Sequence, residues 1–509
     1  MFATDVITWH NDNSRTGQNT KETILTPLNV NATNFGKLMT LTVDDTVDAQ
    51  PLYLADVTIP NKGVHNVLYV ATQNDSVYAF DADNGALYWH VSLVPAGQTP
   101  ADEVDGCVGI VPTIGVTSTP VIDRAFGAHG TIFLVGMTKD SLGTYHQYLH
   151  SLDVTTGAEQ RNSPVDIQAQ YPGTGDNSQG GMVVFDPKQY VQRASLLLMN
   201  HVIYTAWASH CDITPYTGWI IGYNENLTPG PVINVTPNGT QGSIWMSGAG
   251  LAGDGQNIYF SDANGTFDDT LDGNGFPSMG DYGNGLIKLS TANKSLAVAD
   301  YFNMYNTISE SDGDWDLSSG GVLLLPPMKD STGTLKNLAV AAGKDLNMYI
   351  VDRDNMGKFN PGFNNIWQEI DGVLTAGIWG APAYFNGNLY YGPQKSKMLQ
   401  FRFNRALLST AALSKTATTF NYPGTTPSVS ANGNTNGIVW TIEHGQPGVL
   451  SVLHAYSATS LTQELYNSNQ AANKRDNFGQ AAHLTTPTII NGKVYVGCSK
   501  TVVVFGLLH

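Results

Sequence analysis

The sequence predicts an all-β protein, a single β-propeller of about eight four-stranded antiparallel blades. Two observations support this prediction. Apolar and polar residues alternate in many short segments, and 53 glycines in 509 residues suit the tight turns between them. A unit of three or four such segments also recurs along the chain at a spacing of roughly 40 to 60 residues, which is typical of propeller blades.

The clearest copy of this unit covers residues 68–93, LYVATQNDSVYAFDADNGALYWHVSL. Alternate positions are apolar within each of its three segments, as expected for half-buried strands. Asn74-Asp75 and residues 83–85 (DNG) separate the segments, and these residue types tolerate the left-handed backbone of tight turns. The copy is therefore predicted to be a meander of three antiparallel strands.

The last copy ends after three strands, so its fourth strand must come from another part of the chain. We expect residues 38–43 to complete the blade formed by residues 487–507, which closes the ring and removes exposed sheet edges. Residues 1–509 then form a single domain. Seven blades is the alternative count, and an open β-solenoid is the alternative architecture.

Composition narrows the class of protein. The net charge of −17 argues against nucleic-acid binding, because phosphate binding needs clustered Lys and Arg. No apolar run is long enough to cross a membrane. The low Lys content and the abundance of Asn, Thr and Gly favour a secreted or periplasmic protein. Cys107, Cys211 and Cys498 cannot all pair within one chain, so no disulfide framework is predicted.

One segment of the opening copy carries a family signature. AFDADNGALYW, residues 79–89, is similar to the blade motif Ala-x-Asp-x-x-x-Gly-x-x-x-Trp of quinoprotein dehydrogenases, in which the Trp docks one blade on the next. Further segments resemble the quinoprotein alcohol dehydrogenases in blade order. The resemblance implies an oxidoreductase that oxidises an alcohol, sugar or polyol with pyrroloquinoline quinone and calcium. Its small-molecule substrate would enter the central channel, and a separate electron acceptor would be needed.

Three segments match the quinone pocket of that family. In GSIWMSGAG, Trp245 resembles the Trp beneath the quinone, and a planar quinone needs an aromatic surface. In AGKDLNMYI, Lys344 matches the basic residue that contacts the quinone oxygens and stabilises negative charge on them. AGIWGAPAYF keeps the family Trp as Trp379, with Ile378 in place of the family Asn. The resemblance thus implies Trp245, Lys344 and Trp379 as cofactor-binding residues.

The resemblance also implies metal-binding and catalytic residues. Asn264 in SDANGTF occupies the position of the calcium-binding Asn. Asp316 in SDGDWDLSS matches the proposed catalytic base, and we expect it to act with Lys344 and to bind the metal. The family's calcium Glu is absent. Its segment reads WASHCDITPYTGW, where we expect Asp212 to stand in as an oxygen ligand, whereas His210 and Cys211 would instead suit a softer metal.

Other departures keep a second function open. The family's adjacent Cys pair near the quinone appears here only as Cys107, so no vicinal disulfide can form. The Arg after that pair and the Glu expected near VDAQPLY are missing as well. The alternative is a cofactor-free propeller whose channel binds a ligand or a protein, or serves another reaction.

Most candidate residues also have a structural explanation, but Lys344 is harder to explain in this way, since an unpaired buried ammonium is costly. Propeller cores use Trp between blades, Asn-Gly forms turns, and an Asp such as Asp316 can cap a turn. The loop 265–283, GTFDDTLDGNGFPSMGDYG, is expected to shape the channel mouth, with calcium binding as a further option. We expect Trp245, Asn264, Asp316 and Lys344 to converge at one mouth of the central channel.

Overall fold

The computed structural model describes residues 4–102, 104–445 and 448–508. Within these residues the only α-helix is α1 (Thr307–Asp312). The other helices are 3-10 turns of three residues each: η1 (Met246–Gly248), η2 (Ala292–Lys294), η3 (Leu317–Ser319) and η4 (Ala472–Lys474). All remaining regular structure is strand, which confirms the prediction of an all-β protein.

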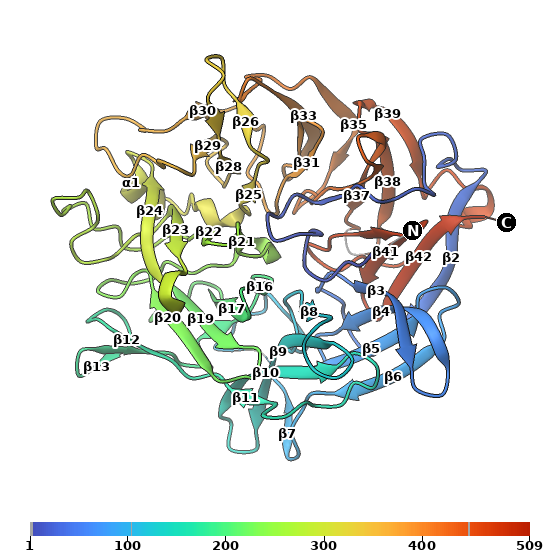
Figure 1. Ribbon diagram of the computed structural model, residues 1–509, viewed down its shortest axis with the longest axis horizontal. Helices are drawn as coiled ribbons and strands as arrows, with labels where there is room; N and C mark the ends of the chain where they lie inside the picture. Colours follow the sequence, from blue (N-terminus) through green and yellow to red (C-terminus); the bar gives the residue numbers. More distant parts are fainter. Residues whose placement is uncertain (1–3, 103, 446–447, 509) are drawn as a thin grey trace.

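Eight sheets of four or five strands make up most of the described chain. Figure 1 shows them one after another around a common centre, from blue through green and yellow to red. The first four sheets, each in spatial order, are β3 (Leu52–Ile59), β4 (Gly63–Ala71), β5 (Ser76–Asp81), β6 (Leu87–Ser92); β11 (Val165–Asp166), β10 (Tyr145–Asp153), β9 (Thr131–Asp140), β7 (Gln98–Pro100), with β8 (Val121–Asp123) also on β9; β16 (Leu197–Met199), β17 (Val202–Ala206), β19 (Trp219–Asn224), β20 (Pro229–Asn234); and β21 (Ala252–Gly253), β22 (Asn257–Ser261), β23 (Gly285–Ser290), β24 (Ala297–Asn303).

The other four sheets continue this order and end with the two termini of the chain. They are β25 (Leu323–Leu324), β28 (Leu338–Ala341), β29 (Met348–Asp352), β30 (Gln368–Ile370); β31 (Ala383–Phe385), β32 (Asn388–Tyr391), β33 (Ser396–Asn404), β34 (Leu407–Leu408), with β35 (Ser414–Phe420) also on β33; β1 (Gln18–Asn19), β36 (Ser428–Asn432), β37 (Thr435–Glu443), β38 (Val452–Ser457), β39 (Ser460–Asn467); and β2 (Phe35–Thr42), β42 (Thr501–Leu507), β41 (Lys493–Cys498), β40 (Thr488–Ile490).

Three smaller sheets of the described residues lie in loops, either between two of these eight sheets or between strands of one sheet. They are β12 (Gln170–Pro172), β14 (Met182–Val184), β13 (Ser178–Gln179); β15 (Tyr190–Val191), β18 (Ala208–Ser209); and β26 (Met328–Lys329), β27 (Leu335–Lys336). The pair β15 and β18 contributes to the pocket described below, which is lined by Val191 of β15 and by Ala208 and Ser209 of β18.

The opening meander folds as the alternating pattern predicts. β4 pairs with β5 and β5 with β6, all antiparallel. The indole N–H of Trp89 donates to the carbonyl oxygen of Val154 (3.2 Å), which lies beyond the end of β10 in the next sheet. Gly157, at φ +71°, faces the same ring, and a Cβ there would approach the indole to 2.6 Å. Trp89 thus docks its sheet on the following one.

The N-terminal segment pairs with the last strand of the chain. β2 runs antiparallel to β42, from the pair Phe35 and Leu507 to the pair Thr42 and Thr501. The predicted pairing of residues 38–43 with the C-terminal strands is therefore present. The N-terminal region also adds β1, which pairs with β36 in parallel. Because β1 has only two residues, the sequence shows no strand pattern there.

The core lies between the faces of neighbouring sheets. Ile220 of β19, Phe260 of β22 and Ile287 of β23 belong to one buried cluster, which joins two successive sheets. Both faces of most sheets are covered in this way, so inner strands such as β5 are buried at every residue. This burial explains why inner strands show weaker alternation than outer ones.

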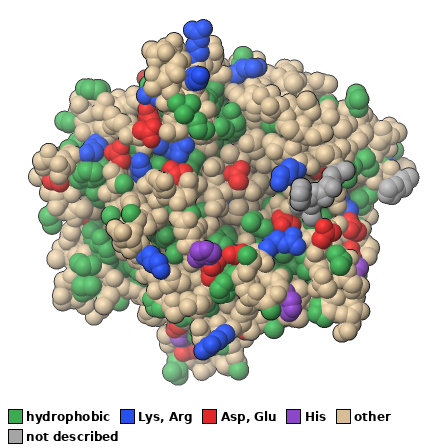
Figure 2. Space-filling model, viewed as in Figure 1, with side chains coloured by type: hydrophobic (Ala, Val, Ile, Leu, Met, Phe, Trp, Pro, Cys, Tyr) green, Lys and Arg blue, Asp and Glu red, His purple; other side chains and the backbone are tan. Residues whose placement is uncertain are grey.

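The surface carries charges of both signs. On the face drawn in Figure 2, Lys and Arg side chains are scattered among Asp, Glu and neutral residues. No helix of the described residues is long and apolar enough to span a membrane.

Candidate functional site

A pocket of about 310 Å³ lies where loops from distant parts of the chain meet. This volume is within the range of small-molecule sites, about 300–1,000 Å³. The residues that matter below come from segments spread from the start to the end of the chain: Asp48, Cys107, Arg193, Cys211, Asp212, Trp245, Trp379 and Tyr422. The two predicted aromatic residues, Trp245 and Trp379, are therefore both in its wall.

A carboxylate and an ammonium group form the centre of the adjoining polar cluster. Lys344 Nζ lies 2.7 Å from Asp316 Oδ2 and 2.7 Å from Asp314 Oδ1. The main-chain N–H of Lys344 also donates to the carbonyl oxygen of Asp316 (3.2 Å). Lys344 is thus held against Asp316 by its backbone and by its side chain.

Asp316 has an oxygen left over. Its side chain is buried, Oδ2 faces Lys344, and Oδ1 has no hydrogen-bond partner in the described structure. The side chain makes no capping bond to η3, so the turn-capping explanation for this Asp does not apply. Burial raises the pKa of the Asp316 carboxyl to about 6, although the charge of Lys344 opposes the shift.

Asn264 joins the same cluster through Asp314. Its Nδ2 donates to Asp314 Oδ1 (2.9 Å), the oxygen that also accepts from Lys344. Its Oδ1 is buried and, like Asp316 Oδ1, finds no hydrogen-bond donor among the described residues. Two buried, unpartnered oxygen atoms thus occur in one cluster, and oxygen atoms are the ligands that a hard cation such as calcium prefers.

Short backbone contacts connect this cluster to the pocket wall. The N–H of Met246, next to Trp245, donates to Ser318 Oγ in η3 (3.3 Å). The N–H of Ile378, next to Trp379, donates to the carbonyl oxygen of Gly343 (3.0 Å). The structure therefore brings Asn264, Asp316 and Lys344 together and places both Trp residues beside them.

Asp212 lies on the opposite wall of the pocket. It is exposed, and its Oδ1 accepts hydrogen bonds from Ser209 Oγ and Tyr216 Oη, both at 3.1 Å. Its negative charge contributes to the raised pKa of Asp316, after the larger effect of burial. The role of Asp212 as a replacement for the family's calcium Glu stays a prediction.

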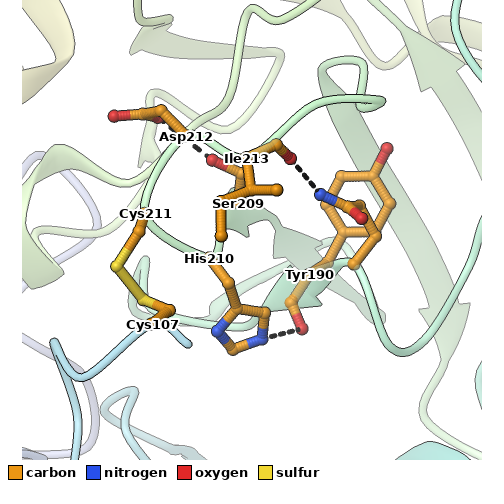
Figure 3. The surroundings of a disulfide bond; sticks show 8 residues. Cys107, Tyr190, Ser209, His210, Cys211, Asp212 and Ile213 are labelled. Atoms are coloured by element: carbon orange, nitrogen blue, oxygen red, sulfur yellow. Dashed lines mark hydrogen bonds between the residues drawn. A yellow bond between two sulfur atoms is a disulfide. The ribbon is translucent and has the colours of Figure 1, made fainter. Parts of the chain in front are cut away.

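The structure corrects the interpretation of the cysteines. Cys107 and Cys211, 104 residues apart, form a disulfide bond at the pocket wall (Figure 3). The sequence analysis treated Cys107 as unpaired and Cys211 as a ligand for a softer metal, and both interpretations were wrong. The free thiol is Cys498, which is buried.

One ring nitrogen of His210 is engaged by the backbone. Its ring is buried, and Nε2 lies 3.1 Å from the carbonyl oxygen of Tyr190 (Figure 3). Burial lowers the pKa of His210 to about 4, so the ring is neutral near pH 7. The segment from His210 to Asp212 forms a turn after β18 and not a strand, which is why its side chains do not alternate between two faces.

Sequence reasoning missed two charged residues of the pocket. Asp48 lies in VDAQPLY, the segment where the family's Glu is absent, and it lines the pocket together with Arg193. Burial raises the pKa of Asp48, and the charge of Arg193 opposes this shift. Arg193 donates to the carbonyl oxygen of Thr117 (2.8 Å). Arg193 thus brings a guanidinium to the pocket. In the family the Arg follows the adjacent Cys pair, which is a different segment of the chain.

Two carboxylates of the Asp-rich loop, residues 265–283, accept hydrogen bonds from within the loop. Asp268 accepts hydrogen bonds from the N–H groups of Thr270 and Met279 and from Ser278 Oγ, at 2.6 to 3.0 Å. Asp272 accepts from two further N–H groups of the same loop. These bonds explain the Asp content of the loop as turn stabilisation.

Comparison with known proteins gives a match in structure but not in sequence. No protein-family model matches the chain, and no curated protein matches its sequence. Solved structures that match almost the whole chain include two quinohemoprotein alcohol dehydrogenases and a methanol dehydrogenase. A quinohemoprotein alcohol dehydrogenase from Comamonas testosteroni has a TM-score of 0.64 at 13% identity, over 99% of this chain and 80% of that one.

The other two structures give the same result. A quinohemoprotein alcohol dehydrogenase from Pseudomonas putida HK5 has a TM-score of 0.60 at 11% identity, over 99% of this chain and 80% of that one. A europium-containing methanol dehydrogenase has a TM-score of 0.61 at 10% identity, over 99% of this chain and 98% of that one. The chain shares the fold of these dehydrogenases. The resemblance indicated by the motifs is confirmed at the level of the β-propeller fold.

Proposed function

We propose that the protein is a quinoprotein-type oxidoreductase that oxidises an alcohol, sugar or polyol with pyrroloquinoline quinone and calcium. The observation that carries the proposal is the pair of buried, unpartnered oxygens, Asn264 Oδ1 and Asp316 Oδ1, beside Lys344. Leaving two such atoms unpaired is unfavourable unless a ligand satisfies them. In the proposed architecture each of the eight sheets is one blade. β2 closes the ring, and the pocket lies at one mouth of the central channel.

The residues fit this cofactor set in a definite arrangement. Trp245 and Trp379 offer aromatic faces to the quinone from the pocket wall. Asn264 Oδ1 would supply an oxygen ligand to the cation and Asp212 a further negative charge, which leaves Asp316 Oδ1 for the substrate hydroxyl. The bound cofactor, with its carbonyl polarised by the cation, would supply the acceptor for the hydride of the substrate.

Asp316 is the proposed base for the substrate hydroxyl. With a pKa of about 6 it is mostly ionised at pH 7, yet it is basic enough to accept a proton during the reaction. Lys344 holds Oδ2, so Oδ1 is the oxygen free to accept the proton. Asp314 positions Lys344 from the other side, and it restrains Asn264 through the same oxygen.

The exposure and hydrogen bonding of Asp212 favour the alternative function, a cofactor-free propeller that binds a ligand or protein. Its Oδ1 already accepts two hydrogen bonds, and its side chain is exposed, so it is a weaker ligand than a buried Glu. The same pocket would then bind a small molecule without redox chemistry.

Calorimetric titration of metal-free protein with pyrroloquinoline quinone, with and without calcium, tests the proposal. We expect binding that depends on calcium. Trp245→Ala should weaken this binding, whereas Asp316→Asn should leave the quinone bound but stop substrate oxidation. Trp367→Ala is the control, since Trp367 lies outside the pocket. Absence of binding at sub-millimolar quinone in both conditions would reject the oxidoreductase and favour the binding propeller.

The disulfide supports a location. Disulfide bonds persist in oxidising compartments and are rare in the cytosol, so Cys107–Cys211 agrees with the proposal of a secreted or periplasmic protein. In that setting a separate protein or small molecule would accept the electrons.

A further inference from the structure

A second cluster of ligand-type side chains lies outside the pocket. Asp123, His201 and Glu225 each offer one ligand atom, and these atoms all lie within 4.8 Å of one another. None of the three lines the pocket described above. They form the one such group of three His, Cys, Asp or Glu side chains found among the described residues.

The cluster is built where two neighbouring sheets meet. Asp123 is the last residue of β8, while His201 precedes β17 and Glu225 follows β19. β17 and β19 pair through Val202 and Asn224, and the N–H of Glu225 donates to the carbonyl oxygen of His201 (3.3 Å). Two ligands are therefore fixed on one sheet, and the third comes from the sheet before it.

Glu225 is the member of the cluster that needs a partner. Its side chain is 7% exposed, and Oε1 finds no hydrogen-bond donor among the described residues. Oε2 lies 2.8 Å from Nδ1 of His201. The carboxylate of Asp123 lies within hydrogen-bonding reach of Glu225, and two like charges at this separation repel each other unless a proton or a cation lies between them.

Among the described residues, the ion pair that Glu225 makes is with His201 and not with a Lys or Arg side chain. Arg124 follows Asp123 directly, but its guanidinium donates to both oxygens of Asp5 and to the carbonyl oxygen of Ala55, all at 2.8 Å. Asp123 Oδ1 accepts from the N–H of Ala125 (2.6 Å), which leaves its other oxygen for a ligand.

We propose that Asp123, His201 and Glu225 form a binding site for a borderline divalent ion such as Zn²⁺, which links two adjacent sheets. One imidazole nitrogen and two carboxylate oxygens are a zinc ligand set, with the fourth position left to water. Calcium would require six to eight oxygens, which this cluster lacks. Zinc ligand atoms lie about 3.4 Å apart in a tetrahedral site, so the exposed His201 ring has only a small distance to move.

The test is calorimetric titration of EDTA-treated protein with Zn²⁺. His201 has φ +65°, so His201→Asn keeps the backbone conformation and removes the imidazole. We expect micromolar or tighter binding to the wild-type protein and at least about tenfold weaker binding to His201→Asn and to Glu225→Gln. Zn²⁺ should also raise the melting temperature of the wild-type protein but not that of His201→Asn.

His129 gives a matched control. Its Nδ1 lies 2.7 Å from Asp153, the same kind of contact, but without a third ligand. His129→Asn should bind Zn²⁺ like the wild-type protein. The proposal is overturned if the wild-type protein does not bind Zn²⁺, if His201→Asn binds it equally well, or if His129→Asn loses binding to the same extent. Equal stabilisation by Ca²⁺ would reject the assignment of a borderline ion.

Discussion

Single residues decide what the pocket can do. The motif resemblance predicted that Asp316, Lys344 and Asn264 lie close together, and the structure brings them into one cluster. Each of them lies in a short segment that can be matched to a family motif residue by residue. Asp314 could not be predicted, since the family pattern leaves the residue before the Trp variable. Arg193 lies in no matched motif, and its contribution to the pocket depends on chain contacts that sequence spacing does not encode.

The raised pKa of Asp316 has a consequence for stability. The carboxyl has a pKa of about 6 in the folded protein and 3.8 as its ordinary value. Between these pH values the folded state binds more protons than the unfolded state, so the free energy of unfolding falls as the pH rises through this window. Ionised Asp316 therefore destabilises the protein at pH 7 by up to about 3 kcal/mol.

Asp316→Asn removes this ionisation and should stabilise the protein. We expect its free energy of unfolding to exceed the wild-type value by about 1–3 kcal/mol at pH 7.5, with the difference shrinking toward pH 4. Urea unfolding at the two pH values measures it. Asp330→Asn is the control, because hydrogen bonds in an exposed turn lower the pKa of Asp330 and the variant should gain no stability. A less stable Asp316→Asn protein at pH 7.5 would contradict the assignment.

At the scale of elements, regular strands were predictable and the long connections were not. The meander of residues 68–93 follows from alternation and turn residues, which are local properties. The disulfide joins the segment before β8 to the turn after β18, 104 residues later. Cysteine pairing depends on distance in space, which the sequence of three cysteines does not determine.

The disulfide should stabilise these two connections. Closing a loop of 104 residues corresponds to at most about 5 kcal/mol in the chain-entropy model, and about 2–4 kcal/mol is typical. We expect the double variant Cys107→Ser, Cys211→Ser to melt at a lower temperature and to bind the quinone more weakly. Reducing agent should destabilise the wild-type protein but not this variant.

Cys498 provides the control for this experiment, since its thiol is free and buried. Cys498→Ala keeps the disulfide and should retain the sensitivity of the wild-type protein to reducing agent. If reducing agent affected the double variant as strongly as the wild-type protein, the disulfide would not be the stabilising element.

At the scale of the whole molecule, sequence analysis predicted the pairing of the two ends of the chain, which joins segments far apart in the sequence. The missing fourth strand of the last copy was enough to indicate it. The number of copies was harder to fix, because the eight sheets differ in strand lengths and in added strands such as β1, β8 and β35. Because the identity to the three structures is only 10–13%, they show the fold, and the chemistry of the site has to be argued from the residues of this chain.

The proposed ring closure predicts that β2 stabilises every sheet and not only its own. Leu41 and Thr42 are neighbours on β2, but Leu41 is buried in a cluster with Val502 and Val504 of β42, whereas Thr42 is exposed. Leu41→Asp should lower the free energy of unfolding by about 3 kcal/mol or more, because it buries an unpaired charge. Thr42→Asp should change it by less than about 0.5 kcal/mol.

Deletion of the residues before Ala49 should destabilise the protein further, since it exposes the edge of β42. Tryptophan fluorescence and circular dichroism should report one coincident transition in each variant, because a closed ring loses all its sheets together. A truncated protein that melts like the full chain would show that the ring does not depend on β2.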